Sequence, residues 1–104
     1  MDCGTELQFF NNVYTRIITK ERSLFKFYMY CTLMDRHKNI FNILDDKDKN
    51  TILSLSLDIY DLGYVCDIDI LSDFVMDNKE EILLENFDFE DLVYRFKFRM
   101  EDNI

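Results

Sequence analysis

The residues best suited to acid–base, nucleophilic or metal chemistry are few and widely spaced in this chain of 104 residues. His37 is the only histidine, and the three cysteines are Cys3, Cys31 and Cys66. Zinc sites usually draw ligands from close pairs such as C-x-x-C, and the sequence contains no such pair. An odd number of separated thiols also argues against a disulfide framework. We therefore expect small buried or half-buried thiols in a reducing, cytoplasmic compartment, and no metal site.

Carboxylates are abundant, but their spacing matches neither a catalytic pair nor a calcium loop. The acidic run from Asp45 to Asp48 lacks the glycine and the closing glutamate of a calcium loop. Glu80 and Glu81 are adjacent, so a helix places them on different faces, as is usual for solvated residues. The sequence also has no glycine-rich phosphate loop, no G-x-S-x-G element and no H-E-x-x-H pair. These absences predict a protein that is not an enzyme and that carries no cofactor.

Composition predicts one folded domain that binds neither nucleic acid nor membrane. The chain is 48% hydrophobic and 15% aromatic, which is too apolar for a disordered acidic tail. The chain has 12 Lys and Arg residues and 21 Asp and Glu residues, and the resulting net charge of −9 opposes binding to phosphates. No apolar run approaches the roughly 18 residues of a membrane span, and the first residues lack a signal-peptide layout.

Apolar residues recur at helical spacing through the first 88 residues. Thr5 and Gln8 have the form of a capping box before an apolar stripe, which predicts a helix from about Glu6 to Ile18. Thr19 is a candidate N-cap for a second helix over about residues 20–34. Four shorter helices are expected at residues 39–44, at 52–62 before Gly63, at 68–75 after the cap Asp67, and through 82–84 after a capping box at Asp77 and Glu80. Six short helices predict a compact antiparallel all-α bundle.

The C-terminal residues fit two kinds of structure. Residues 93–100 alternate apolar and basic side chains, as a strand does, whereas Phe89, Leu92, Phe96 and Met100 fit one face of a helix that Asp88 could cap. The all-helical context favours an extra helix. We therefore expect a domain over residues 1–88 and a C-terminal extension or linker over residues 89–104.

Charge is distributed unevenly along the chain. Residues 1–44 carry a net charge of +2 and residues 45–104 carry −11. One interpretation is a solvated acidic surface that keeps the protein in solution. The other is a molecule with a basic end, formed by Arg16, Lys20 and Arg22 together with Lys26, that contacts the acidic half of another copy.

Three segments carry a resemblance to a known family. The second predicted helix begins E-R-S-L-F-K-F at residues 21–27, Gly63 is followed by D-I-D-I-L at residues 67–71, and the sixth predicted helix opens K-E-E-I-L-L at residues 79–84. Over about residues 6–88 these segments resemble the death-effector domain of the death-fold superfamily. The resemblance implies a six-helix antiparallel bundle of the death-fold type.

The resemblance also implies a surface charge triad. In the family, an acid at the start of helix two bonds the Arg and Asp of an R-x-D-L motif on helix six. The matching residues are Glu21, Lys79 and Glu81. The motif of this sequence therefore reads K-x-E-I in place of R-x-D-L. Lysine lacks the planar fork that lets arginine bind two carboxylates, so a looser triad is expected. The alternative interpretation is that these three residues are ordinary surface charges near the starts of helices.

The second predicted helix is the expected interaction surface. Nine of the eleven residues from Leu24 to Met34 are apolar or aromatic, more than one buried face can hold. Family members centre a homotypic interface on an exposed aromatic that corresponds to Phe27. Phe25 and Phe27 point in different directions on a helix, so both cannot be buried. The expected patch comprises Phe27, Phe25, Lys26, Tyr28 and Tyr30.

The function implied by the resemblance is homotypic recruitment in apoptotic or innate immune signalling. The expected partners are other death-effector domains, in adaptors and initiator-caspase prodomains, and further copies that assemble into oligomers or filaments. A death domain, caspase-recruitment domain or pyrin domain is a related alternative. A different class remains open as well: a small viral helical decoy, either a Bcl-2-like groove protein or an acidic mimic of nucleic acid.

Overall fold

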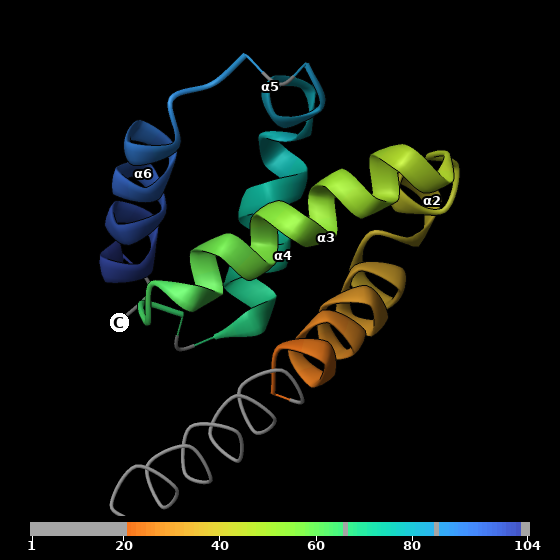
Figure 1. The fold of residues 1–104 in the computed structure, drawn as a ribbon, viewed down its shortest axis with the longest axis horizontal. Helices are drawn as coiled ribbons and strands as arrows, with labels where there is room; N and C mark the ends of the chain where they lie inside the picture. Colours follow the sequence, from red (N-terminus) through yellow and green to blue (C-terminus); the bar gives the residue numbers. More distant parts are fainter. Residues whose placement is uncertain (1–20, 66, 85, 103–104) are drawn as a thin grey trace, which may run out of the picture.

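The computed structural model describes residues 21–65, 67–84 and 86–102, and all regular secondary structure in these ranges is helical. A helix over residues 21–36 is followed by α2 (Lys38–Phe41), α3 (Asp46–Asp61), α4 (Ile68–Asp77), α5 (Lys79–Leu83) and α6 (Phe89–Asp102). In Figure 1, α3 and α4 occupy the middle of the molecule, with the 21–36 helix and α6 on different sides. The predicted all-α bundle is confirmed. The helix predicted over 6–18, with Cys3, Cys66, Arg16 and Lys20, lies outside the described residues.

Aspartates begin three of the helices. The side chain of Asp45 accepts a hydrogen bond from the Asp48 amide at 2.8 Å, and Asp67 and Asp88 bond the amides two residues later at 2.9 and 3.0 Å. These bonds satisfy amides that have no partner within the helix, so they fix where each helix begins. The expected caps at Asp67 and Asp88 are confirmed. The expected cap at Asp77 is wrong, because Asp77 is the last residue of α4 and Asn78 precedes α5.

Gly63 ends α3 in the way its position predicts. Its φ of +82° lies in the left-handed region, and its amide bonds the Tyr60 carbonyl at 3.0 Å. A residue with a Cβ adopts that φ at a cost, so glycine is favoured here. The chain then turns toward Asp67 and α4.

One hydrophobic core joins all the longer helices. The 21–36 helix contributes Phe25, Met29 and Leu33, spaced four residues apart, and α3 packs against α4 and α5. The fully buried apolar side chains of the remaining helices are Phe41, Ile52, Ile59, Leu71, Val75, Ile82, Leu92 and Phe96. Burial of this apolar surface is the main favourable contribution to folding.

The C-terminal segment is a helix and belongs to this core. α6 buries four side chains on one face, at positions 92, 93, 96 and 100, and the ring of Phe96 lies 5.3 Å from that of Phe74. Arg95 donates to Glu81 at 2.8 Å, and Arg99 donates to Asp77 at 2.6 Å. These pairs join α6 to α5 and α4, so residues 89–102 pack as part of the bundle.

Candidate interaction surface

The 21–36 helix has one buried face and one exposed apolar face. Leu24, Phe27 and Tyr28 are 49%, 60% and 54% exposed, and Cys31 is also exposed. The spacing of these four residues, i, i+3, i+4 and i+7, places them in one stripe opposite the buried face. We call this stripe (Leu24, Phe27, Tyr28 and Cys31) the aromatic face. The rings of Phe27 and Tyr28 lie 6.0 Å apart within it.

Phe25 does not belong to the exposed patch that the sequence predicted. It is buried, and its ring stacks on that of Tyr60 in α3 at a centroid distance of 4.0 Å and an interplanar angle of 13°. Helical spacing explains the correction, because Phe25 lies four residues before Met29 on the inner face. Tyr30 lies at the margin, exposed but with its ring edge-on to Phe41 at 5.8 Å.

Lys26 and Arg22 lie on the side of the helix away from the aromatic face, because each stands three residues before a buried residue of the inner face, Met29 and Phe25 respectively. Lys26 is half-buried and forms no ion pair within the described part of the chain. Arg22 is paired with Asp61 at the end of α3, so its charge is partly balanced inside the molecule. Of the expected basic end, the structure therefore places Arg22 and Lys26 on the helix that carries the aromatic face.

The three residues of the expected charge triad are not brought together. The Nζ atom of Lys79 lies 3.9 Å from Oε1 of its neighbour Glu80, and Glu81 forms an ion pair with Arg95 of α6. Glu21 belongs to the 21–36 helix and forms no ion pair with Lys79 of α5. The arginine that Glu81 binds belongs to the C-terminal segment, which the resemblance does not cover.

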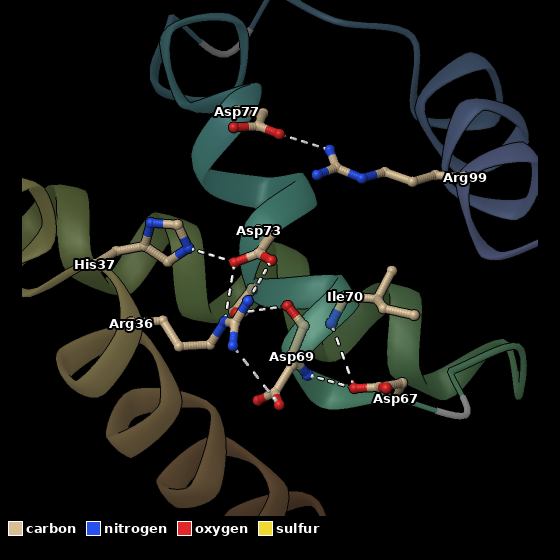
Figure 2. Close-up of polar contacts among 9 residues, drawn as sticks. Arg36, His37, Asp67, Asp69, Ile70, Asp73, Asp77 and Arg99 are labelled. Carbon is tan, nitrogen blue, oxygen red and sulfur yellow. Dashed lines mark hydrogen bonds and ion pairs between the residues drawn. The ribbon is translucent and has the colours of Figure 1, made fainter. Parts of the chain in front are cut away.

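A charged cluster that the sequence analysis missed fixes the other end of the helix. Figure 2 shows Asp73 of α4 between Arg36 and His37. Arg36 donates from Nε and Nη2 to the two Asp73 oxygens at 3.1 and 2.7 Å, and His37 Nε2 lies 2.7 Å from Oδ1. Arg36 Nη1 also lies 3.8 Å from Asp69, one turn earlier on α4. The bidentate pair has a defined geometry, so it orients the helix that carries the aromatic face.

This cluster predicts a pH-dependent contribution to stability. The hydrogen bonds from Arg36 and then from His37 lower the pKa of Asp73, against the opposing effect of burial. A carboxylate with a lowered folded pKa stabilises the fold above its unfolded pKa and loses that contribution as pH falls through the folded value. We expect Asp73→Asn to reduce the free energy of unfolding by about 1 kcal/mol at pH 7.

Urea unfolding of wild type and Asp73→Asn at pH 7 and pH 3 measures this contribution. The difference between the two proteins should shrink at pH 3, because the carboxylate of the unfolded wild-type chain binds a proton below its ordinary pKa and the charged native form then loses part of its advantage. Asp58→Asn is the control, since Asp58 is exposed on α3 and forms no ion pair with any described residue. Equal pH dependence in wild type and Asp73→Asn would contradict the assignment.

Metal-ligating side chains are not clustered in the part of the chain that the structure describes. Within residues 21–65, 67–84 and 86–102, no group of three or more His, Cys, Asp or Glu is placed to hold a metal ion. None of the described helices is both long and apolar enough to cross a membrane. Comparisons with protein-family models, with curated proteins and with solved structures found no match to this chain. The structure therefore defines an all-α bundle in which the 21–36 helix exposes an aromatic face.

Proposed function

We propose that this chain is a protein–protein interaction module that associates through the aromatic face. The observation that carries the proposal is the two-sided 21–36 helix, whose inner face is buried while Leu24, Phe27 and Tyr28 face outward. Aromatic side chains gathered on a surface concentrate binding energy when a partner excludes water from them. Contiguous exposed apolar side chains of this kind typically mark an interaction site.

The partner that the charges favour is a second copy of the chain. Residues 1–44 carry a net charge of +2 and residues 45–104 carry −11. A basic part and an acidic part of one molecule suit contact between unlike regions of two copies. The proposal is therefore homotypic association.

The resemblance to death-effector domains supplies the proposed class of partner. The matching helix of that family also uses an exposed aromatic, and Phe27 is exposed here. On this basis we propose recruitment of adaptors and initiator-caspase prodomains in apoptotic or innate immune signalling. Since Glu21, Lys79 and Glu81 lie apart, the charge triad lends no support, and the proposal depends on the aromatic face.

Substitution of Phe27 by aspartate tests the proposal directly. We expect wild type to self-associate over a concentration series in analytical ultracentrifugation, and Phe27→Asp to weaken the association at least about 30-fold. Far-UV circular dichroism should be unchanged, because the substituted side chain is already exposed to solvent.

Leu84→Asp is the matched control, since Leu84 is an exposed leucine at the end of α5, away from the 21–36 helix. It should associate as wild type does. A wild-type chain that stays monomeric at high concentration and captures no death-effector partner would contradict the proposal. Binding to a basic protein with steep salt dependence, unaffected by Phe27→Asp, would instead indicate the acidic mimic of nucleic acid.

A further inference from the structure

A second apolar surface lies on the outer side of α6. Tyr94 and Phe98 are 65% and 56% exposed, and their ring centroids lie 6.3 Å apart. Because they are four residues apart, they form one row along the helix, opposite the side that buries Leu92 and Phe96. We call Tyr94 and Phe98 the α6 row. The resemblance to death-effector domains ends near residue 88, so the α6 row is not part of the surface that the resemblance implies.

A surface hollow lies on each side of the α6 row. The volumes are about 450 and 400 Å³, and Tyr94 lines both hollows. Val93 lines the first and Arg95 the second, and these two neighbours of Tyr94 lie on opposite sides of the helix. Leu62 and Tyr64, which follow α3, form another wall of the first hollow. A row between two hollows suits a partner helix, because the side chains of that helix can straddle the row.

Acids lie at both ends of the α6 row. Glu90 stands four residues before Tyr94 and Glu101 three residues after Phe98, which places both acids on the stripe that carries the row. Both are exposed, as is Asp102, and none of the three forms an ion pair with any residue that the structure describes. The 11 residues between positions 90 and 101 span about 16 Å along the helix axis.

The basic residues of α6 do not balance these acids. Arg95 and Arg99 donate to acids of α5 and α4 at 2.8 and 2.6 Å. Lys97 Nζ lies 3.8 Å from the centroid of the Tyr64 ring. The charge at the two ends of the α6 row is therefore negative, and a partner that covers the row has complementary charge when it brings cations to both ends.

The same charge pattern disfavours the aromatic face of a second copy as that partner. Glu21 stands three residues before Leu24, Asp35 stands four residues after Cys31, and both acids are exposed. A contact between the aromatic face and the α6 row would therefore bring acids against acids, and like charges across an interface oppose binding. The charges favour a basic partner instead.

We propose that the α6 row is a docking site for a basic amphipathic helix of another protein. Apolar side chains of that helix enter the two hollows, and its Lys or Arg residues lie near Glu90 and Glu101. A helix packed along α6 meets both acids when its basic residues are about 11 positions apart, with apolar residues between them on the same face. The inference does not depend on homotypic association, because it concerns a different helix and a different partner.

Fluorescence anisotropy with a labelled peptide tests the inference. The probe is a peptide of about 18 residues with leucine on one helical face and lysine on the other, and the control peptide has glutamate in place of each lysine. We expect wild type to bind the lysine peptide saturably and not to bind the glutamate peptide. Tyr94→Asp should weaken binding at least about tenfold, because it removes the ring between the two hollows. Phe27→Asp is the matched control, since it makes the same change in net charge on the aromatic face, and it should bind as wild type does.

A second pair of variants tests the role of the acids. Replacing Glu90 and Glu101 together by glutamine should weaken binding at least about fivefold and reduce its salt dependence. The control replaces Asp46 by asparagine and Glu80 by glutamine, which removes the same charge from exposed positions on α3 and α5. This control should bind as wild type does. Circular dichroism with urea unfolding checks that every variant folds.

The outcomes separate this inference from the proposed function. Equal binding by wild type and Tyr94→Asp, or no saturable binding to wild type, would overturn the inference. Loss of binding in Phe27→Asp but not in Tyr94→Asp would also overturn it, because the basic peptide would then bind the aromatic face. Self-association is measured separately by sedimentation of wild type and Phe27→Asp, so either proposal can fail while the other stands.

Discussion

Replacing Phe96 by alanine is expected to lower the free energy of unfolding by about 3–5 kcal/mol. Phe96 is fully buried, and its ring packs against Phe74 of α4. The substitution removes a large apolar side chain and leaves a cavity that the neighbouring helices fill only in part. Since single domains are stable by only about 5–15 kcal/mol, this loss is a large fraction of the total. Urea unfolding followed by circular dichroism measures it.

Phe98→Ala is the matched control for Phe96→Ala. The two residues lie on the same helix and have the same side chain, but Phe98 is exposed. We expect Phe98→Ala to change the free energy of unfolding by no more than about 0.5 kcal/mol. Equal losses for the two variants would contradict the packing of α6 against the core.

The sequence could predict α6 as a helix, but not how closely it joins the bundle. The apolar residues 92, 93, 96 and 100 fall on one helical face, and this periodicity is visible without a structure. The pairs Arg95–Glu81 and Arg99–Asp77 join residues 14 and 22 positions apart, and nothing in the local pattern indicates such pairs. The expectation of a separate extension arose because the resemblance to death-effector domains ends near residue 88.

Some helix boundaries could be predicted from the sequence and others could not. Asp67, Gly63 and Asp88 act locally, so their cap and turn roles could be predicted from residue type and position. α3 begins at Asp46, six residues before the expected Ile52, because its first turns are polar and carry no apolar signal. The expected helix over 39–44 is only Lys38–Phe41 in the structure.

The aromatic face could also be predicted only in part from the sequence, because helical periodicity is a local property and the packing of the helix against the bundle is not. Excess apolar residues over 24–34 indicated that one face of the helix had to remain exposed, and the structure exposes Phe27 and Tyr28. The choice between Phe25 and Phe27 depends on which side of the helix meets α3. That choice and the contact of Arg36 with Asp73 are tertiary properties that one sequence does not specify.

Contacts at both ends hold the helix that carries the aromatic face. Arg22 pairs with Asp61 near its start, and Arg36 pairs with Asp73 at its last residue. Between these pairs, Phe25, Met29 and Leu33 are buried against the bundle. A helix held in this way presents the aromatic face in one orientation, so little conformational entropy is lost when a partner binds.

Alanine substitutions at Phe25 and Phe27 should have opposite consequences. Phe25→Ala is expected to reduce the free energy of unfolding by about 3 kcal/mol, because Phe25 is buried and stacked on Tyr60. Phe27→Ala should change it by no more than about 0.5 kcal/mol and should weaken self-association at least about tenfold. Urea unfolding gives the first quantity for each variant, and sedimentation gives the second.

The comparison is informative because the two variants make the same chemical change two residues apart. In Phe25→Ala the aromatic face keeps all its side chains, so the folded fraction should still self-associate. In Phe27→Ala the core keeps all of its side chains, and only the outer surface becomes smaller. A large loss of stability from Phe27→Ala would mean that the 21–36 helix packs with its other side inward, and both the aromatic face and the function proposed from it would then be wrong.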